Sequence, residues 1–174
     1  MLTPQQTDTP GVTDTRSDVH RGEHRAGNPI KGLLLAVGLA ALWHASGGRI
    51  ATPALVVWGV YLLAGLLFVA AYSRRAMPRS TADGLAIVSY VIDLLFVTFL
   101  VYATGGLTSD LYVLFGPLAL KAAVYYPVLP VLLVLSYLIA PLYAAALRLS
   151  AGGWWFLLDP AFLPRYVMLF ALMF

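Results

Sequence analysis

The sequence predicts an all-α fold, a polytopic transmembrane helical bundle with about six spans. Of the 174 residues, 60 % are hydrophobic and 11 % are charged, and the mean hydropathy is +0.82. Soluble domains carry roughly twice this share of charged residues. Apolar runs alternate along the chain with short polar or glycine-rich stretches, which is typical of consecutive membrane-spanning helices. We therefore expect an integral membrane protein.

Residues 1–29 differ in composition from the rest of the chain. They are rich in Thr, Asp, Arg, Gly and Pro and poor in aromatic and β-branched aliphatic residues, so they cannot bury enough apolar surface to fold alone. We predict a disordered cytoplasmic tail over 1–29 and a transmembrane bundle over 30–174. His20 and His24 could form a metal-binding pair only on a helix, which Gly22 and its neighbours disfavour, and no metal site is expected.

The predicted spans cover residues 30–45, 53–72, 84–104, 111–126, 128–147 and 163–174. Gly116 and Pro117 should kink or break the short fourth span, and a re-entrant segment is the alternative there. Pro141 predicts a kink in the fifth span. The sixth apolar run is shorter than the ~20 residues that cross a bilayer. We expect it to be a truncated span of a longer protein.

The basic residues predict the orientation of the bundle. By the positive-inside rule, the side that carries more Lys and Arg faces the cytoplasm. This assigns to the inside Arg16, Arg21, Arg25, Lys31, Arg74, Arg75 and Arg79, and to the outside Arg49, Arg148 and Arg165. The expected partner is the lipid bilayer. Nucleic acid is not expected, because the basic residues do not follow one face.

The third and fourth spans meet at a glycine-rich turn, residues 105–110, which we call the elbow. Gly105 and Gly106 can adopt positive φ, and the short polar residues after them form turns and helix caps. At about 1.5 Å per helical residue, Asp93 and Lys121 each lie roughly 17 Å from the elbow, one on either arm. An unpaired charge at that depth costs at least ~2.5 kcal/mol. An intramembrane ion pair between Asp93 and Lys121 is therefore predicted.

Two interpretations of this ion pair are open. It could only fasten one helix to another, because buried pairs are weak evidence even for stability. It could also form a ligand-polarising or proton-sensitive centre, because ionisable groups inside membranes are often functional.

We predict a ligand-binding site at the elbow. A turn with two glycines exposes backbone N–H groups at the membrane surface, where an amphipathic head such as a quinone ring could bind. The alternative is a turn with no ligand. The predicted polar contacts are Tyr102, Thr104, Gly105, Gly106, Thr108, Ser109 and Asp110, and the predicted apolar wall is Phe99, Tyr112 and Phe115.

The segments Asp93-Leu94-Leu95 and Tyr102-Ala103-Thr104-Gly105-Gly106-Leu107, followed by Pro117, resemble the membrane input region of bacterial sensor histidine kinases of the redox-responsive RegB type. This resemblance implies six spans before a cytoplasmic dimerisation and kinase region, a homodimer, and location in the bacterial cytoplasmic (inner) membrane. It also implies quinone binding at a Gly-Gly-x-x-Asn-Pro-Phe segment. Here Ser109, Asp110 and Leu111 replace Asn-Pro-Phe.

The expected function is a sensory input module in two-component signal transduction. No phosphoacceptor or ATP-binding segment matches the chain, so no catalytic residue and no kinase activity is assigned to these residues. Two alternatives remain: a structural or assembly subunit of a membrane complex, or a small transporter. The sequence has no cysteine, which excludes a disulfide, a thiol switch or a cysteine-ligated cluster within these residues.

Overall fold

The computed structural model describes residues 15–72, 79–125, 134 and 137–171. These residues form helices and turns, with no strand among them, and the predicted all-helical class is confirmed to that extent. The α-helices are α1 (Thr15–Ala45), α2 (Thr52–Tyr72), α3 (Arg79–Ala103), α4 (Phe115–Tyr125), α6 (Ile139–Ala151) and α7 (Phe162–Ala171). Three short 3-10 helices, η1 (Gly106–Thr108), η2 (Asp110–Leu114) and η3 (Trp155–Leu158), lie in the turns.

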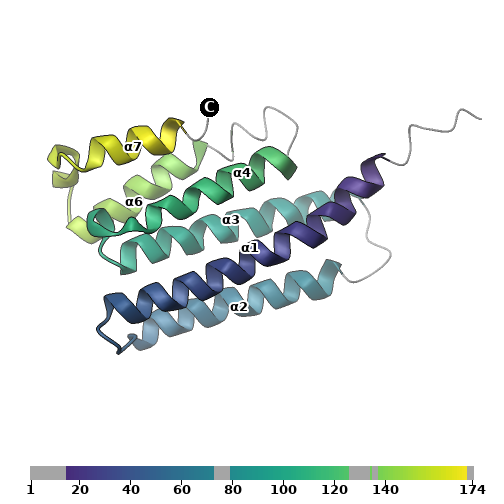
Figure 1. The fold of residues 1–174 in the computed structure, drawn as a ribbon, viewed down its shortest axis with the longest axis horizontal. Helices are drawn as coiled ribbons and strands as arrows, with labels where there is room; N and C mark the ends of the chain where they lie inside the picture. The colour runs from purple at the N-terminus through teal and green to yellow at the C-terminus, as the bar shows by residue number, and fades with distance from the viewer. Residues whose placement is uncertain (1–14, 73–78, 126–133, 135–136, 172–174) are drawn as a thin grey trace, which may run out of the picture.

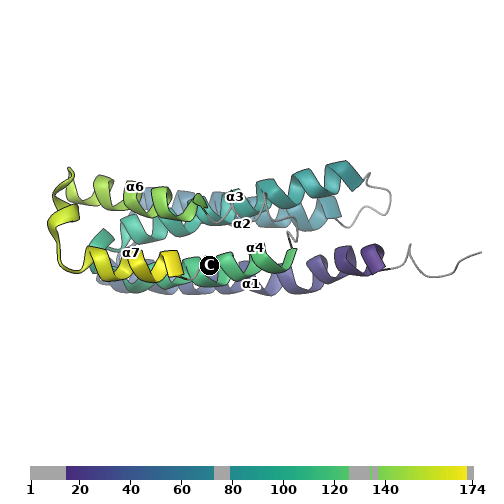
Figure 2. The ribbon, with the colours of Figure 1, turned by 90° about the horizontal axis from the view of Figure 1, so that it is seen from above.

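The helices run side by side in two layers (Figures 1 and 2). One layer holds α2, α3 and α6, and the other holds α1, α4 and α7. Helix α3 is central, because it contacts α1, α2, α4 and α6. Its side chains are accordingly far more buried than those of α2, which is covered on one side only.

Only two of the described helices are long and apolar enough to cross a membrane by length and composition. They are Thr52–Tyr72 and Asp83–Ala103, with mean hydropathies of 2.4 and 2.3. The apolar parts of α1 and α6, Pro29–Ala45 and Ile139–Ala151, are shorter. Most of the predicted fifth span before Ile139 lies outside the described residues.

Helix α1 begins earlier than the predicted first span. It starts at Thr15 and passes through Pro29, so helix occupies residues 15–29, where disorder was expected, and its N-terminal end extends beyond the other helices (Figure 1). Extending an existing helix costs much less than nucleating one. The packed part of α1 therefore supports helix in a segment that could not fold alone.

Three prolines lie in the first turn of a helix. Pro117, Pro141 and Pro164 are each the third residue of their helix, in α4, α6 and α7. The first turn of a helix has N–H groups without intrahelical partners, so proline is tolerated there. The predicted break in the fourth segment falls where η2 gives way to α4, between Leu114 and Phe115, just before Pro117. Near Pro141, the described residues show a turn at Leu138 between helical Tyr137 and the start of α6 at Ile139, where the interruption of the fifth segment was predicted.

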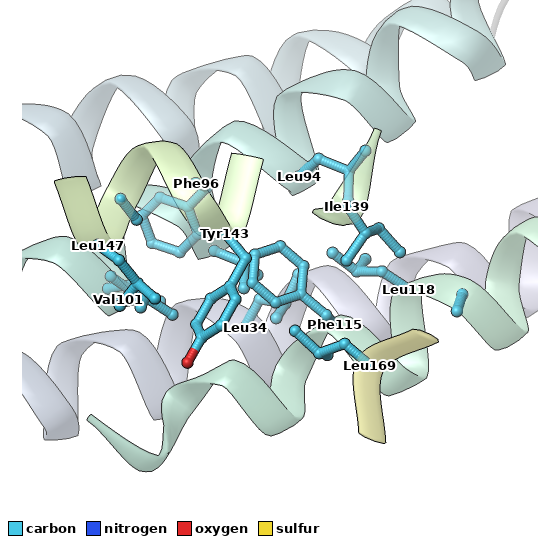
Figure 3. Packing of buried hydrophobic residues seen from close by; sticks show 14 of the residues in the cluster. Leu34, Leu94, Phe96, Val101, Phe115, Leu118, Ile139, Tyr143, Leu147 and Leu169 are labelled. Carbon is cyan, nitrogen blue, oxygen red and sulfur yellow. The ribbon is translucent and has the colours of Figure 1, made fainter. Parts of the chain in front are cut away.

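The apolar core lies between the two layers. Figure 3 shows Tyr143 and Phe115 side by side at its centre, with their ring centroids 6.3 Å apart and the rings nearly perpendicular. Leucine, isoleucine and valine side chains from α1, α3, α4, α6 and α7 surround them: Leu34, Leu94, Val101, Leu118, Ile139, Leu147 and Leu169. This packing fixes the positions of α3 and α4, which carry the buried Asp93 and Lys121.

Candidate functional site

A buried charged cluster lies where α1, α2, α3 and α4 meet. Asp93 of α3 has no exposed surface. Lys121 Nζ donates a hydrogen bond to Asp93 Oδ2 at 2.7 Å, so the two residues predicted to form an ion pair are in contact. Lys31 Nζ of α1 donates to Asp93 Oδ1. The Tyr61 hydroxyl of α2 donates to the same oxygen at 2.9 Å. We call Lys31, Tyr61, Asp93 and Lys121 the lysine–aspartate centre.

Lys31 corrects the sequence analysis, which assigned it to the cytoplasmic charges that orient the bundle. Its side chain is only 12 % exposed and is paired with Asp93. Helix α1 starts well before Ile30, so Lys31 lies inside the helix rather than at its N-terminal end. The long lysine side chain then carries its ammonium group to the depth of Asp93.

Aromatic rings surround the Lys31 ammonium. Its Nζ lies 5.5 Å from the centroids of both the Tyr61 and the Phe68 rings, which favours the charged ammonium through cation–π attraction. The Tyr61 ring stacks on Phe96 at a centroid distance of 3.9 Å. Tyr61 therefore holds a fixed orientation against α3 while its hydroxyl bonds Asp93.

The chain contains only two lysines, and both of them bind Asp93. The other nine of its eleven basic residues are arginines. Lysine differs from arginine because it is a compact cation that can lose its proton, whereas arginine stays charged. This distribution was visible in the sequence and could have identified Lys31 as a partner of Asp93.

The elbow is a compact turn that supplies many of its own hydrogen bonds. Gly105 and Gly106 have φ values of 112° and 60°. The hydroxyl groups of Thr104 and Ser109 lie 2.6 Å apart, and Ser109 Oγ also accepts a hydrogen bond from the backbone N–H of Leu111. The left-handed backbone at both glycines reverses the chain, as the sequence indicated.

Arg165 of α7 binds the elbow from a segment far along the chain. Its guanidinium donates to the backbone carbonyl of Leu107 and, at 3.2 Å, to that of Ser109. It also lies 3.4 Å from Asp110 Oδ1 and 4.9 Å from the centroid of the Tyr112 ring. By its position in the sequence, Arg165 was expected near the outer surface, with no contact assigned to it. The planar fork of donors in arginine explains how one side chain binds several acceptors.

The residues predicted to bind a ligand at the elbow do not all face outward. Gly106 and Ser109 are buried, and Thr104 is partly buried. Tyr102, Gly105, Thr108 and Asp110 are exposed. Of the predicted apolar wall, Phe115 belongs to the buried core, while Phe99 and Tyr112 are partly buried.

The two candidate sites differ in their chemistry. The lysine–aspartate centre offers buried charge and exchangeable protons, and the elbow offers backbone groups and one exposed carboxylate. Among the described residues, no group of three or more His, Cys, Asp or Glu side chains is placed to hold a metal ion. No protein-family model, curated protein or solved structure matches the chain.

Proposed function

We propose that the chain is the membrane-embedded sensory input module of a two-component sensor histidine kinase. In this proposal six helical segments cross or enter the cytoplasmic membrane of a bacterium, the N-terminus and the end of α7 face the cytoplasm, and the elbow faces outward. The output region would lie in a cytoplasmic part of a longer protein, which would form the homodimer.

The observation that carries the proposal is the bonding of Arg165 to the elbow. A sensor must connect the place where a stimulus acts to the helix that leads to its output. Arg165 makes this connection directly, because its guanidinium on α7 bonds two elbow carbonyls and Asp110. A change in the elbow would therefore alter the position of α7. A bias of only ~1 to 3 kcal/mol between two positions of α7 is enough for such coupling.

A quinone is the proposed lipid-phase ligand. The exposed Tyr102 and Asp110 border the turn, where a ring with polar oxygens could enter from the membrane surface. This part of the proposal rests on the resemblance described above and on the position of the elbow at the end of the bundle.

Spin-label distance measurements in lipid nanodiscs can test the proposal. The chain has no cysteine, so labels at Leu63→Cys on α2 and Leu163→Cys on α7 report one distance, and both positions are exposed. Adding a short-chain ubiquinone, oxidised or reduced, should shift this distance. The shift should disappear in Arg165→Gln and persist in Arg148→Gln, whose arginine stacks on Trp154.

Two outcomes would contradict the proposal. An unchanged distance with both forms of the quinone would remove the quinone as the stimulus. An equal shift in Arg165→Gln and in the parent would show that α7 responds without the contact that carries the argument.

A small transporter is the second candidate, favoured by the buried charges of the lysine–aspartate centre. Buried ionisable groups near the middle of a bundle are typical of ion and proton pathways. Uptake of a labelled solute by proteoliposomes that contain this chain would favour the transporter over the sensor.

A further inference from the structure

We propose that the lysine–aspartate centre is an intramembrane proton-binding site that gains and releases one proton. This inference does not depend on the sensory proposal, because it concerns the charge of the centre rather than its output. It rests on three observations: the charge count, the burial of the three charged side chains, and their shared hydrogen bonds.

The charge count of the centre does not balance when all its groups are ionised. Two ammonium groups and one carboxylate leave a net charge of +1, with Asp93 fully buried, Lys121 9 % exposed and Lys31 12 % exposed. An uncompensated charge in a buried, low-dielectric site is costly. Releasing one lysine proton removes that excess, because one ammonium and one carboxylate then remain.

Among the side chains that the structure describes, Asp93 is the only acid that bonds either lysine. The sequence has eight acidic residues. Those other than Asp93 lie in the N-terminal region, at the exposed start of α3 or in the elbow and the turn before α7: Asp8, Asp14, Asp18, Glu23, Asp83, Asp110 and Asp159. Residues 73–78, 126–133, 135–136 and 172–174 contain no acidic residue at all.

The ionisable groups around the centre come from four helices. Lys31 of α1 and Tyr61 of α2 share one oxygen of Asp93, and Lys121 of α4 bonds the other. Tyr90, nearly one turn before Asp93 on α3, interacts with the same carboxylate electrostatically. In the described parts of α6 and α7, no ionisable side chain bonds the centre. The exchangeable proton is therefore one of the ammonium protons of Lys31 and Lys121, which both bond the Asp93 carboxylate.

The chemical step is a simple proton transfer. An ammonium N–H bond of Lys31 or Lys121 breaks, the proton passes to water, and the nitrogen keeps the electron pair as a neutral amine. The Asp93 carboxylate retains one cationic partner in either state. The neutral amine forms a weaker hydrogen bond than the ammonium, so proton release loosens α1 or α4 from α3.

The two lysines allow a direct measurement. The chain labelled with ¹⁵N at lysine Nζ gives two side-chain signals in detergent micelles, one for each residue. Exposed lysines remain ammonium groups up to about pH 10.4. We expect one of the two signals to change from ammonium to amine at a lower pH than an exposed lysine would.

Substitutions identify the cause of this change. In Lys31→Met or Lys121→Met the remaining lysine pairs with Asp93 in a neutral site, and its signal should stay that of an ammonium over the same range. In Lys121→Arg the net charge of +1 is retained, so Lys31 should still release its proton.

The contrary results are equally clear. If both signals of the unsubstituted chain remain ammonium up to about pH 10.4, as those of exposed lysines do, the proposal is wrong. If the lysine that remains in a Met variant still becomes an amine there, charge imbalance is not the cause. Should the Met variants fail to fold, the signals of the unsubstituted chain decide the question alone.

Discussion

At the scale of single residues, Asp93 is the acceptor on which the charged interior depends. Its two oxygens accept hydrogen bonds from three side chains, on α1, α2 and α4. The two lysines can substitute for each other as partners of Asp93, but no other residue that the structure describes substitutes for Asp93 as their bonded anion. Either lysine can be lost and Asp93 still has a cationic partner, whereas the loss of Asp93 leaves two buried ammonium groups without a counterion.

This asymmetry predicts a clear order of stabilities. Asp93→Asn should lower the free energy of unfolding by about 3 to 5 kcal/mol, the usual cost of leaving buried charges unpaired. Lys121→Met should cost less, because Lys31 continues to pair with Asp93. Denaturation in mixed detergent micelles measures the free energy of unfolding of both variants. Equal losses in the two variants would show that Lys31 does not compensate.

Asp110→Asn is the matched control for that series. The Asp110 side chain is 92 % exposed, and exposed ion pairs contribute about 0 to 1 kcal/mol. Its removal should leave the denaturation midpoint almost unchanged. A large loss in this control would mean that the method responds to any change of charge.

At the scale of elements, the elbow is held by helices that follow it in the chain. Arg165 on α7 bonds its carbonyl groups, and Gly106 lies directly against the end of α6. A Cβ atom at Gly106 would lie 2.0 Å from Ser150 Oγ and 2.7 Å from Ser150 Cβ. Glycine is thus required at position 106 for its positive φ and for the close approach of α6.

Gly106→Ala should therefore destabilise the bundle, whereas Gly65→Ala on α2 should not. A Cβ at Gly65 meets no atom within 4 Å, and alanine favours helix over glycine by about 1 kcal/mol. Adding Ser150→Gly to Gly106→Ala should restore part of the loss, and strain from the positive φ should account for the rest. Thermal unfolding in detergent measures the series. No recovery in the double variant would indicate that the contact with Ser150 is unimportant.

The elements that could be predicted from sequence are those that depend on local pattern. The helical class, the Gly105-Gly106 reversal and the equal depth of Asp93 and Lys121 all follow from composition, glycine conformation and helical rise. The interruptions predicted near Pro117 and Pro141 fall two to three residues before each proline, at the junction of η2 with α4 and at the turn at Leu138.

At the scale of the whole molecule, the contacts that the sequence did not predict join residues far apart in the chain. Lys31 and Asp93 are 62 positions apart, and Arg165 and Leu107 are 58 apart. No local pattern encodes such contacts, since they depend on how α1 and α7 pack beside α3 and the elbow. The charge balance of the bundle could have suggested Lys31, because Asp93 is the only acidic residue within the predicted spans.

The arrangement of the bundle in the membrane gives the last prediction. The basic N-terminal region and residues 74–79 favour the cytoplasmic side, and α3 then carries the elbow to the outer side. Thr81 and Asp110 lie near the two ends of this path, and both are exposed. Ser109 is a poorer position for a label because only 4 % of its surface is accessible.

Single cysteines at these positions can be labelled in intact cells without labelling elsewhere in the chain, because the chain has no cysteine of its own. A membrane-impermeant maleimide should label Asp110→Cys in intact cells, and Thr81→Cys only after the membrane is permeabilised. Labelling of Thr81→Cys alone in intact cells would show that the bundle has the opposite orientation in the membrane. Labelling of both would show that α3 does not cross the membrane, although its residues Asp83–Ala103 are long and apolar enough to do so. The expected pattern would place the lysine–aspartate centre roughly 15 Å below the outer end of α3, because ten residues separate Asp93 from Ala103 at about 1.5 Å each.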